Sequence, residues 1–171
     1  GMEISDFVQE ELLRQEKKRR RMILICGLMA VICLGYVSLY TYYDYKTANN
    51  YQELSELKEK PVSEAVEQLL DNSPLFTLDK EKEAPEVLEE YKNLLFKNKK
   101  LIGWVKIADT NIDYPVMQTS NNEYYLDHNF DQEYDKNGSL FLDKDCNAAF
   151  PNTNMIIYGH HMKSGKMFGN L

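Results

Sequence analysis

Residues 101–117 read LIGWVKIADTNIDYPVM, and this stretch decides the fold class. Two short apolar runs, residues 101–107 and 112–117, flank the turn-forming sequence Asp109-Thr110-Asn111. This pattern predicts two strands joined by a turn. Because proline cannot donate a hydrogen bond to a neighbouring strand, Pro115 indicates an edge or bulged position for the second strand.

Two more short apolar runs follow. Asn137-Gly138 is a frequent turn sequence and leads into the apolar run 139–142. Residues 155–158 read MIIY, end at Gly159 and predict another buried strand. No helical pattern alternates with these runs, so the domain is predicted to be mainly β, as a barrel or a sandwich.

Helical patterns precede the strands. Pro85 suits a first helical turn, glutamates follow it, and lysines end the run at residue 100. One face of this predicted helix is apolar and should pack on the strands: Val87, Leu88, Tyr91, Leu94 and Leu95. Residues 41–84 are charged, fit a helix broken at Pro61, and include a candidate linker over 71–85. We interpret 41–84 as a stalk and 85–171 as the domain.

Residues 22–40 read MILICGLMAVICLGYVSLY and contain no charge. Nineteen helical residues span roughly 28 Å, close to the hydrocarbon thickness of a bilayer. The basic run KKRRR precedes them at residues 17–21, and tyrosines mark the far end, as in an interfacial aromatic belt. A buried helix of a soluble core is the alternative, but these flanks favour a transmembrane helix that contacts lipid through residues 22–40.

The same segment predicts topology. The apolar run exceeds the ~7–15 residues of a signal-peptide core, and no A-x-A-like site follows it, which favours an uncleaved anchor. The positive-inside rule places residues 1–21 in the cytoplasm. We therefore expect a single-pass protein of the cell membrane whose C-terminal domain is extracellular.

Composition excludes some functions. The 171-residue chain has a net charge of −7 and 43% hydrophobic residues, which argues against nucleic-acid binding. Three cysteines are too few for a disulfide scaffold. Cys26 and Cys33 lie in the apolar run, where they serve as small hydrophobic residues.

Histidine and cysteine are the candidates for chemistry. His160, next to Gly159 at a predicted strand end, is well placed for proton transfer, although a pair of surface histidines explains the sequence equally simply. A metal site built from His128, His160 and His161 is disfavoured, because adjacent residues on extended chain point in opposite directions. Cys146 lies in Asp143-Lys144-Asp145-Cys146-Asn147, whose carboxylates disfavour the reactive thiolate. We interpret Cys146 as incidental.

Several segments in order resemble class B sortases. These are LIGWVKI at 101–107, IDYPVMQ at 112–118, NEYYL at 122–126, GSLFLD at 138–143 and NMIIYGHHMKSGKMFGNL at 154–171. The resemblance covers roughly residues 85–171. It implies an N-terminal anchor, N-terminal helices and part of an eight-stranded β-barrel, of which the closing strands would be missing here.

The resemblance also implies a function. Sortases are extracellular cysteine transpeptidases of Gram-positive bacteria. They cleave a sorting motif on secreted proteins and transfer the acyl group to an amine of the cell-wall precursor or of a pilin. By motif match, His160 is the catalytic histidine, and Asn122, Leu126 and Tyr158 line the sorting-motif groove. No cofactor is implied.

One departure from the family stands out. The family's cysteine lies in a Thr-Cys-like strand well after the histidine, and its arginine lies later still, whereas this sequence ends at Leu171. We expect the 171 residues alone to be inactive, with unpaired strand edges that favour aggregation. The alternative is a non-catalytic single-pass membrane protein whose outer domain binds a partner.

Overall fold

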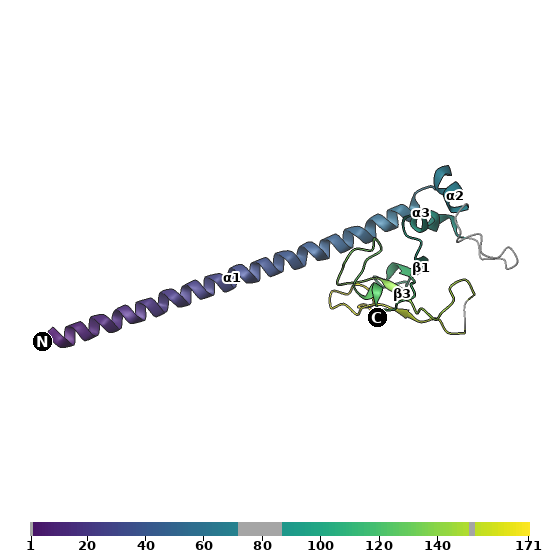
Figure 1. The fold of residues 1–171 in the computed structure, drawn as a ribbon. Helices are drawn as coiled ribbons and strands as arrows, with labels where there is room; N and C mark the ends of the chain where they lie inside the picture. Colours follow the sequence, from purple (N-terminus) through teal and green to yellow (C-terminus); the bar gives the residue numbers. More distant parts are fainter. Residues whose placement is uncertain (1, 72–86, 151–152) are drawn as a thin grey trace. The chain divides into compact units, whose positions relative to one another are not determined.

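The computed structural model describes residues 2–71, 87–150 and 153–171. The chain divides into two compact units, residues 1–46 and residues 47–171. The elements are α1 (Met2–Glu59), α2 (Glu64–Asp71), α3 (Glu89–Lys97), β1 (Leu101–Lys106), β2 (Asp113–Met117), η1 (Tyr124–Leu126), β3 (Leu140–Leu142) and β4 (Ile157–Tyr158) (Figure 1).

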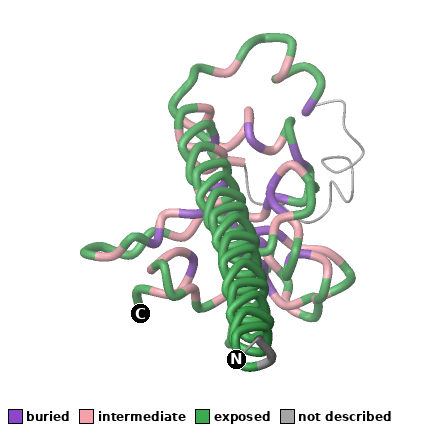
Figure 2. Tube along the Cα trace, turned by 90° about the vertical axis from the view of Figure 1, so that its left-hand side faces the viewer, coloured by how far each residue is buried: buried purple, intermediate pink, exposed green. Residues whose placement is uncertain are grey.

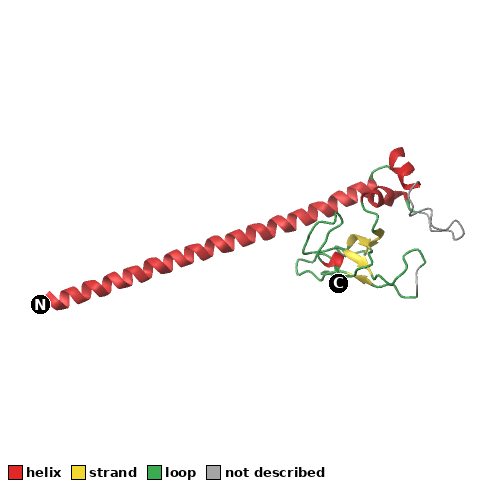
Figure 3. Cartoon of the chain, in the orientation of Figure 1, coloured by secondary structure: helices red, strands yellow, loops and turns green. Residues whose placement is uncertain are grey.

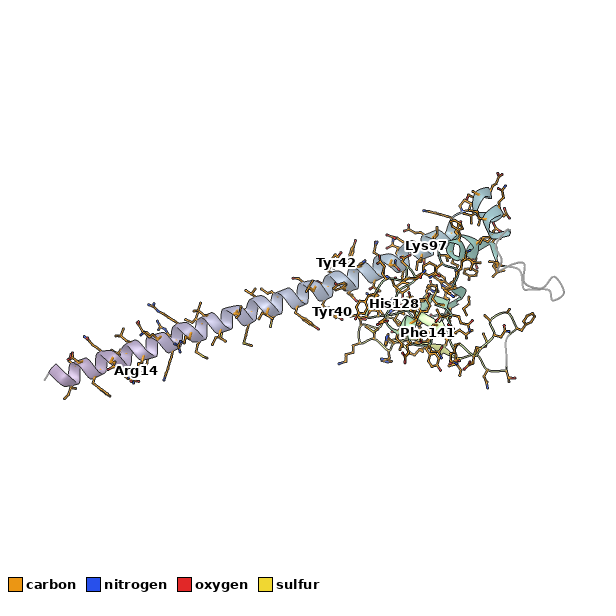
Figure 4. All side chains as sticks on the ribbon, viewed as in Figure 1. Arg14, Tyr40, Tyr42, Lys97, His128 and Phe141 are labelled. Carbon is orange, nitrogen blue, oxygen red and sulfur yellow. The ribbon has the colours of Figure 1, made fainter. Side chains whose placement is uncertain are left out.

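The first unit consists of the N-terminal part of α1. Its described side chains are largely exposed, and the predicted membrane segment 22–40 falls inside this helix (Figure 2). Within the described residues, α1 has the length and the apolar composition needed to cross a membrane. Figure 4 shows Arg14, Tyr40 and Tyr42 projecting from it, and Arg14 pairs with Glu10 at 3.0 Å, one helical turn away.

The second unit begins in the last turns of α1. The helix ends at Glu59, just before Pro61, and α2 follows it, so the predicted break at this proline is confirmed. Leu54 is fully buried and packs with Leu94 of α3, although the sequence placed residues 41–84 in a stalk. Most of the predicted linker 71–85 lies outside the described residues.

Helix α3 is shorter than predicted. It covers Glu89–Lys97 instead of 85–100, and Pro85 lies outside the described residues. Leu88 precedes the first turn in an extended conformation and is exposed, so it does not join the apolar face. The face is confirmed at Leu94, which is fully buried, while Tyr91 and Leu95 pack at the margin of the core.

The strands form one four-stranded sheet in the order β1-β2-β3-β4. β1 and β2 are antiparallel with a register shift between Leu101 and Gly103, and β3 and β4 are antiparallel too. β2 and β3 are parallel, which requires the long connection over residues 118–139 that contains η1. Figure 3 shows how short the strands are beside the loops that join them.

Two strand predictions are wrong. β2 lies between β1 and β3 instead of at an edge, and the register shift lies in β1. Pro115 is tolerated there because β3 pairs only with Val116 and Met117, so the ladder toward β3 starts after the proline. Residues 155–158 do not form a buried strand, since β4 is two residues long and Ile157 is 37% exposed.

Both faces of the sheet are apolar. Residues that alternate along β2 and β3 enter two separate clusters: Met117 and Phe141 join Leu54 and Leu94, whereas Val116, Leu140 and Leu142 join Met167. Side chains alternate between the faces of a strand, so burial on both sides explains why these strands are continuously apolar. The structure thus has a long apolar helix followed by short helices and a small, open, four-stranded sheet.

Candidate active site

His160 lies two residues after the end of β4, next to the closely packed Gly159. A Cβ atom added to Gly159 would overlap the side chains of Leu140 and Phe168, so any larger residue would have to displace them. The backbone N–H of Phe168 donates to the His160 carbonyl at 2.9 Å. Gly159 therefore lets this segment pack closely against Leu140 and Phe168.

The imidazole of His160 meets η1. Its Nε2 lies 2.6 Å from the backbone carbonyl oxygen of Leu126. A carbonyl oxygen can only accept a hydrogen bond, so Nε2 carries the proton in this arrangement. In the neutral tautomer the lone pair is then on Nδ1, and the ring is partly exposed. This nitrogen can accept a proton from a neighbouring acid.

The segment around η1 is fixed from the core. Tyr125 is 1% exposed, its hydroxyl accepts from Asn98 Nδ2 at 3.4 Å, and its carbonyl accepts from the Ser139 N–H at 2.9 Å. Asn122 and Leu126 stand on either side of this anchor. Both are consequently held by a buried residue although they are themselves partly or largely exposed.

Asn122 and Tyr158 converge on one carboxylate. Asp143 Oδ2 accepts from Asn122 Nδ2 at 2.9 Å and from the Tyr158 hydroxyl at 3.0 Å. The Lys144 N–H donates to Asn122 Oδ1 at 2.8 Å, which fixes the amide from its other end. The Tyr158 ring also lies 5.3 Å from that of Phe141, its partner in the β3–β4 register.

These hydrogen bonds shift the pKa values of both Asp143 and Tyr158. The backbone N–H of Asp145 and, next, the Tyr158 hydroxyl lower the pKa of Asp143 below its ordinary value of 3.8. The same hydroxyl–carboxylate bond raises the pKa of Tyr158 above 10.0. At neutral pH the pair is therefore an ionised carboxylate and a protonated phenol.

The four residues singled out from the sequence thus form two contacts between the same two segments. His160 meets Leu126, and Tyr158 meets Asn122 through Asp143. Residues 122–126 lie on one side and residues 158–160 on the other. The imidazole can accept and donate a proton, and the amide and the phenol can form hydrogen bonds.

The chain is similar in sequence to two known sortase B proteins. No family model matches the chain. Sortase B of Listeria monocytogenes is 46% identical over 86 residues, which are 50% of this chain and 35% of that protein. Sortase B of Staphylococcus aureus is 28% identical over 153 residues, which are 89% of this chain and 55% of that protein.

Solved structures give the same result. Sortase B of Bacillus anthracis superposes with a TM-score of 0.59 at 31% identity, over 75% of this chain and 53% of that one. This chain is a sortase B homologue. The Staphylococcus aureus enzyme, solved as a sortase B–substrate complex, matches with a TM-score of 0.54 at 29% identity, over 74% of this chain and 50% of that one. The homologue spans about a third to about half the length of its relatives.

The other two histidines of this sortase B homologue have separate surroundings. His128 Nδ1 lies 2.8 Å from the Tyr124 carbonyl and 2.7 Å from Asp127 Oδ1, and its ring stacks on that of Tyr124. Figure 4 shows His128 in the second unit. His161 is exposed and forms a bridge with Met167. Among residues 2–71, 87–150 and 153–171, no group of three or more His, Cys, Asp or Glu is placed to hold a metal.

Cys146 lies in the loop after β3. Its Sγ is 3.9 Å from the Asn154 carbonyl, and its own carbonyl accepts from Gln118 Nε2 at 2.7 Å. In the described part of the sortase B homologue, no hydrogen bond joins this thiol to a histidine. The incidental role expected from sequence remains a prediction.

Sequence reasoning missed Asp143. The sequence indicated it only as one of the two aspartates near Cys146 and as the last residue of the segment GSLFLD at 138–143, and not as a residue of the groove. Its importance arises only because Asn122 and Tyr158, from two segments distant in the sequence, meet at its carboxylate. The one available signal was its position immediately after the apolar run 139–142.

Proposed function

We propose that this chain is the N-terminal part of a membrane-anchored class B sortase. In this proposal the whole protein cleaves a sorting motif on secreted proteins and transfers the acyl group to a cell-wall or pilin amine. The observation that carries it is the Leu126–His160 contact, seen in a chain homologous to sortase B. That contact brings together two segments that the family resemblance singles out.

His160 acts as general acid and base. The Leu126 carbonyl accepts a hydrogen bond from Nε2–H, which leaves Nδ1 to accept the proton of the attacking thiol. The same nitrogen then returns a proton to the departing amine, so the histidine ends the acylation step in its starting state. The acyl group meanwhile forms a thioester with the nucleophilic sulfur.

The thiol comes from sequence outside these 171 residues. Cys146 has aspartates close by in sequence, and its sulfur atom contacts the backbone carbonyl of Asn154. Neither surrounding favours a thiolate. The relatives are longer than the part matched here, which leaves room for a later cysteine and arginine. The further strands of the eight-stranded barrel belong to the same missing part.

The substrate groove is lined by Asn122, Leu126 and Tyr158. Their side chains are partly or largely exposed, and Asp143 holds the side chains of Asn122 and Tyr158 in place, a combination suited to peptide binding. The sortase B–substrate complex from Staphylococcus aureus supports a peptide ligand for the family. The acceptor is an amine on the cell-wall precursor or a pilin.

The apolar helix anchors the enzyme. Residues 17–21 are basic and residues 22–40 are apolar and exposed, which supports a single pass with the N-terminus in the cytoplasm. The domain that carries His160 then faces the cell wall.

Peptide cleavage tests the proposal. The full-length gene product should cleave a fluorogenic sorting-motif peptide and join it to an added amine, while residues 1–171 alone should not. Replacing Cys146 by alanine in the full-length product should leave turnover unchanged. Turnover by residues 1–171 that this replacement abolishes would contradict the assignment of the nucleophile. A full-length product that binds a partner but cleaves no peptide would favour a non-catalytic membrane protein.

A further inference from the structure

Asp143 lies where three segments of the chain meet. Its backbone N–H donates to the Ile156 carbonyl at 2.9 Å and its carbonyl accepts from Gln118 Nε2 at 2.9 Å. These bonds tie the end of β3 to the residue before β4 and to the residue after β2. The position of the carboxylate is thereby set by backbone contacts on both sides.

Both oxygen atoms of the carboxylate accept hydrogen bonds from nearby donors. Oδ1 accepts the Asp145 N–H at 2.9 Å, and Oδ2 accepts from both Asn122 and Tyr158. Hydrogen bonds to an ionised carboxylate are shorter and stronger than those between neutral groups. Asp143 can therefore hold two side chains that are themselves open to solvent.

This arrangement sets the polarity of the groove. The Tyr158 hydroxyl donates its only hydrogen bond to Asp143, so the phenol oxygen can form further hydrogen bonds only as an acceptor. Asn122 uses one amide hydrogen for Asp143 and keeps the second. A ligand therefore meets a hydrogen-bond acceptor at Tyr158 and a remaining donor at Asn122.

We infer that Asp143 is a positioning residue of the substrate groove. It orients Asn122 and Tyr158 so that Tyr158 accepts a hydrogen bond from a backbone N–H of an extended peptide. The inference rests on the proposed function, because the peptide is the substrate of that reaction. Asp143 itself touches neither the peptide nor the reacting atoms.

The first test does not depend on catalysis. In the detergent-solubilised chain, NMR titration of ¹³Cζ-labelled tyrosine reports the pKa of each phenol, and Tyr158→Phe assigns the resonance. Asp143→Asn should lower the pKa of Tyr158 toward its ordinary value, since it removes the charge that holds the proton. Asp145→Asn is the matched control, because that side chain pairs with Lys144 at 2.8 Å and its charge is the smallest contribution to the raised pKa of Tyr158, so this variant should lower that pKa much less than Asp143→Asn.

The second test uses the full-length gene product. Asp143→Asn should raise KM for the sorting-motif peptide by about tenfold with kcat within about threefold, because uniform binding is lost while the chemistry is kept. Asp145→Asn should alter neither constant.

Each outcome of these two tests either supports or overturns the inference about Asp143. An unchanged Tyr158 titration in Asp143→Asn overturns the inference, as does a lower kcat at constant KM. Loss of folding in Asp143→Asn overturns it too, because Asp143 would then be a structural residue. If the full-length product cleaves no peptide, the proposed function falls, while the NMR titration still judges the role of Asp143.

Discussion

The Nε2 atom of His160 lies 2.6 Å from the carbonyl oxygen of Leu126, which is 34 residues earlier in the chain. The bond holds the His160 side chain against Leu126. The neighbouring His161 instead forms an isolated antiparallel β-bridge with Met167 through its backbone. Two adjacent histidines that are equivalent in composition therefore differ in the structure, and they should differ in activity.

In the full-length gene product, His160→Ala should lower the transpeptidation rate by several orders of magnitude. General acid–base catalysis contributes roughly 10²–10⁴-fold, and the loss of thiolate activation adds to it. His161→Ala should cost less than about tenfold, or ~1.4 kcal/mol of barrier. Comparable losses in two folded variants would contradict the assignment of His160.

The Asp143 contacts should make stability depend on pH at the acid end. The pKa of Asp143 is lowered in the folded protein, so the unfolded chain binds the proton more readily. The stabilisation is therefore complete above the ordinary value of 3.8 and is lost as pH falls through the lower folded value. The difference in melting temperature between wild type and Asp143→Asn should shrink in that window. A difference that is constant down to pH 2 would show that the carboxylate charge is not involved.

Leu54 should be essential for stability although it lies near the end of a long helix. It is fully buried against α3 and the sheet, so Leu54→Ala should destabilise the second unit by about 2–5 kcal/mol in urea unfolding of the detergent-solubilised protein. Leu69→Ala is the matched control, because Leu69 is 57% exposed and should change stability by less than about 0.5 kcal/mol. Equal effects would mean that residues 47–59 do not pack as described.

Gly138 should tolerate no side chain. Its φ of 59° lies in the left-handed region, and an added Cβ would overlap the backbone carbonyls of Tyr125 and Leu126. Gly138→Ala should therefore cost more than about 1–2 kcal/mol in thermal unfolding. Gly103→Ala is the control, since no atom lies within 4 Å of the Cβ position in β1. A stable Gly138→Ala would contradict the turn geometry.

Topology can be tested on intact cells in a Cys146→Ala background. A cysteine introduced at Glu53, which is exposed, should react with a membrane-impermeant thiol reagent, whereas one at Glu10 should react only after permeabilisation. The basic residues 17–21 are the physical reason, because they favour retention in the cytoplasm. The reverse labelling pattern would contradict the extracellular assignment of the domain.

Local patterns in the sequence determined much of this protein. The uncharged run 22–40 specified a long apolar helix, Pro61 specified a break after α1, and the alternation around Asp109-Thr110-Asn111 specified β1 and β2. Gly138 specified its turn, since glycine alone enters the left-handed region without strain. Each of these features depends on the residue itself and its near neighbours. Motif similarity, too, is local, and it singled out His160 with Asn122, Leu126 and Tyr158.

Only the tertiary structure decided how these parts meet. The central position of β2 depends on the parallel pairing with β3 across residues 118–139, which Pro115 alone could not reveal. The exposure of β4 depends on how the rest of the chain packs around it. The burial of Leu54 depends on its packing against Leu94 of α3. The role of Asp143 depends on donors from residues 122, 145 and 158 reaching one carboxylate. Hydrogen bonds between distant segments form only when packing brings their partners within about 3 Å, and no local sequence pattern encodes that distance.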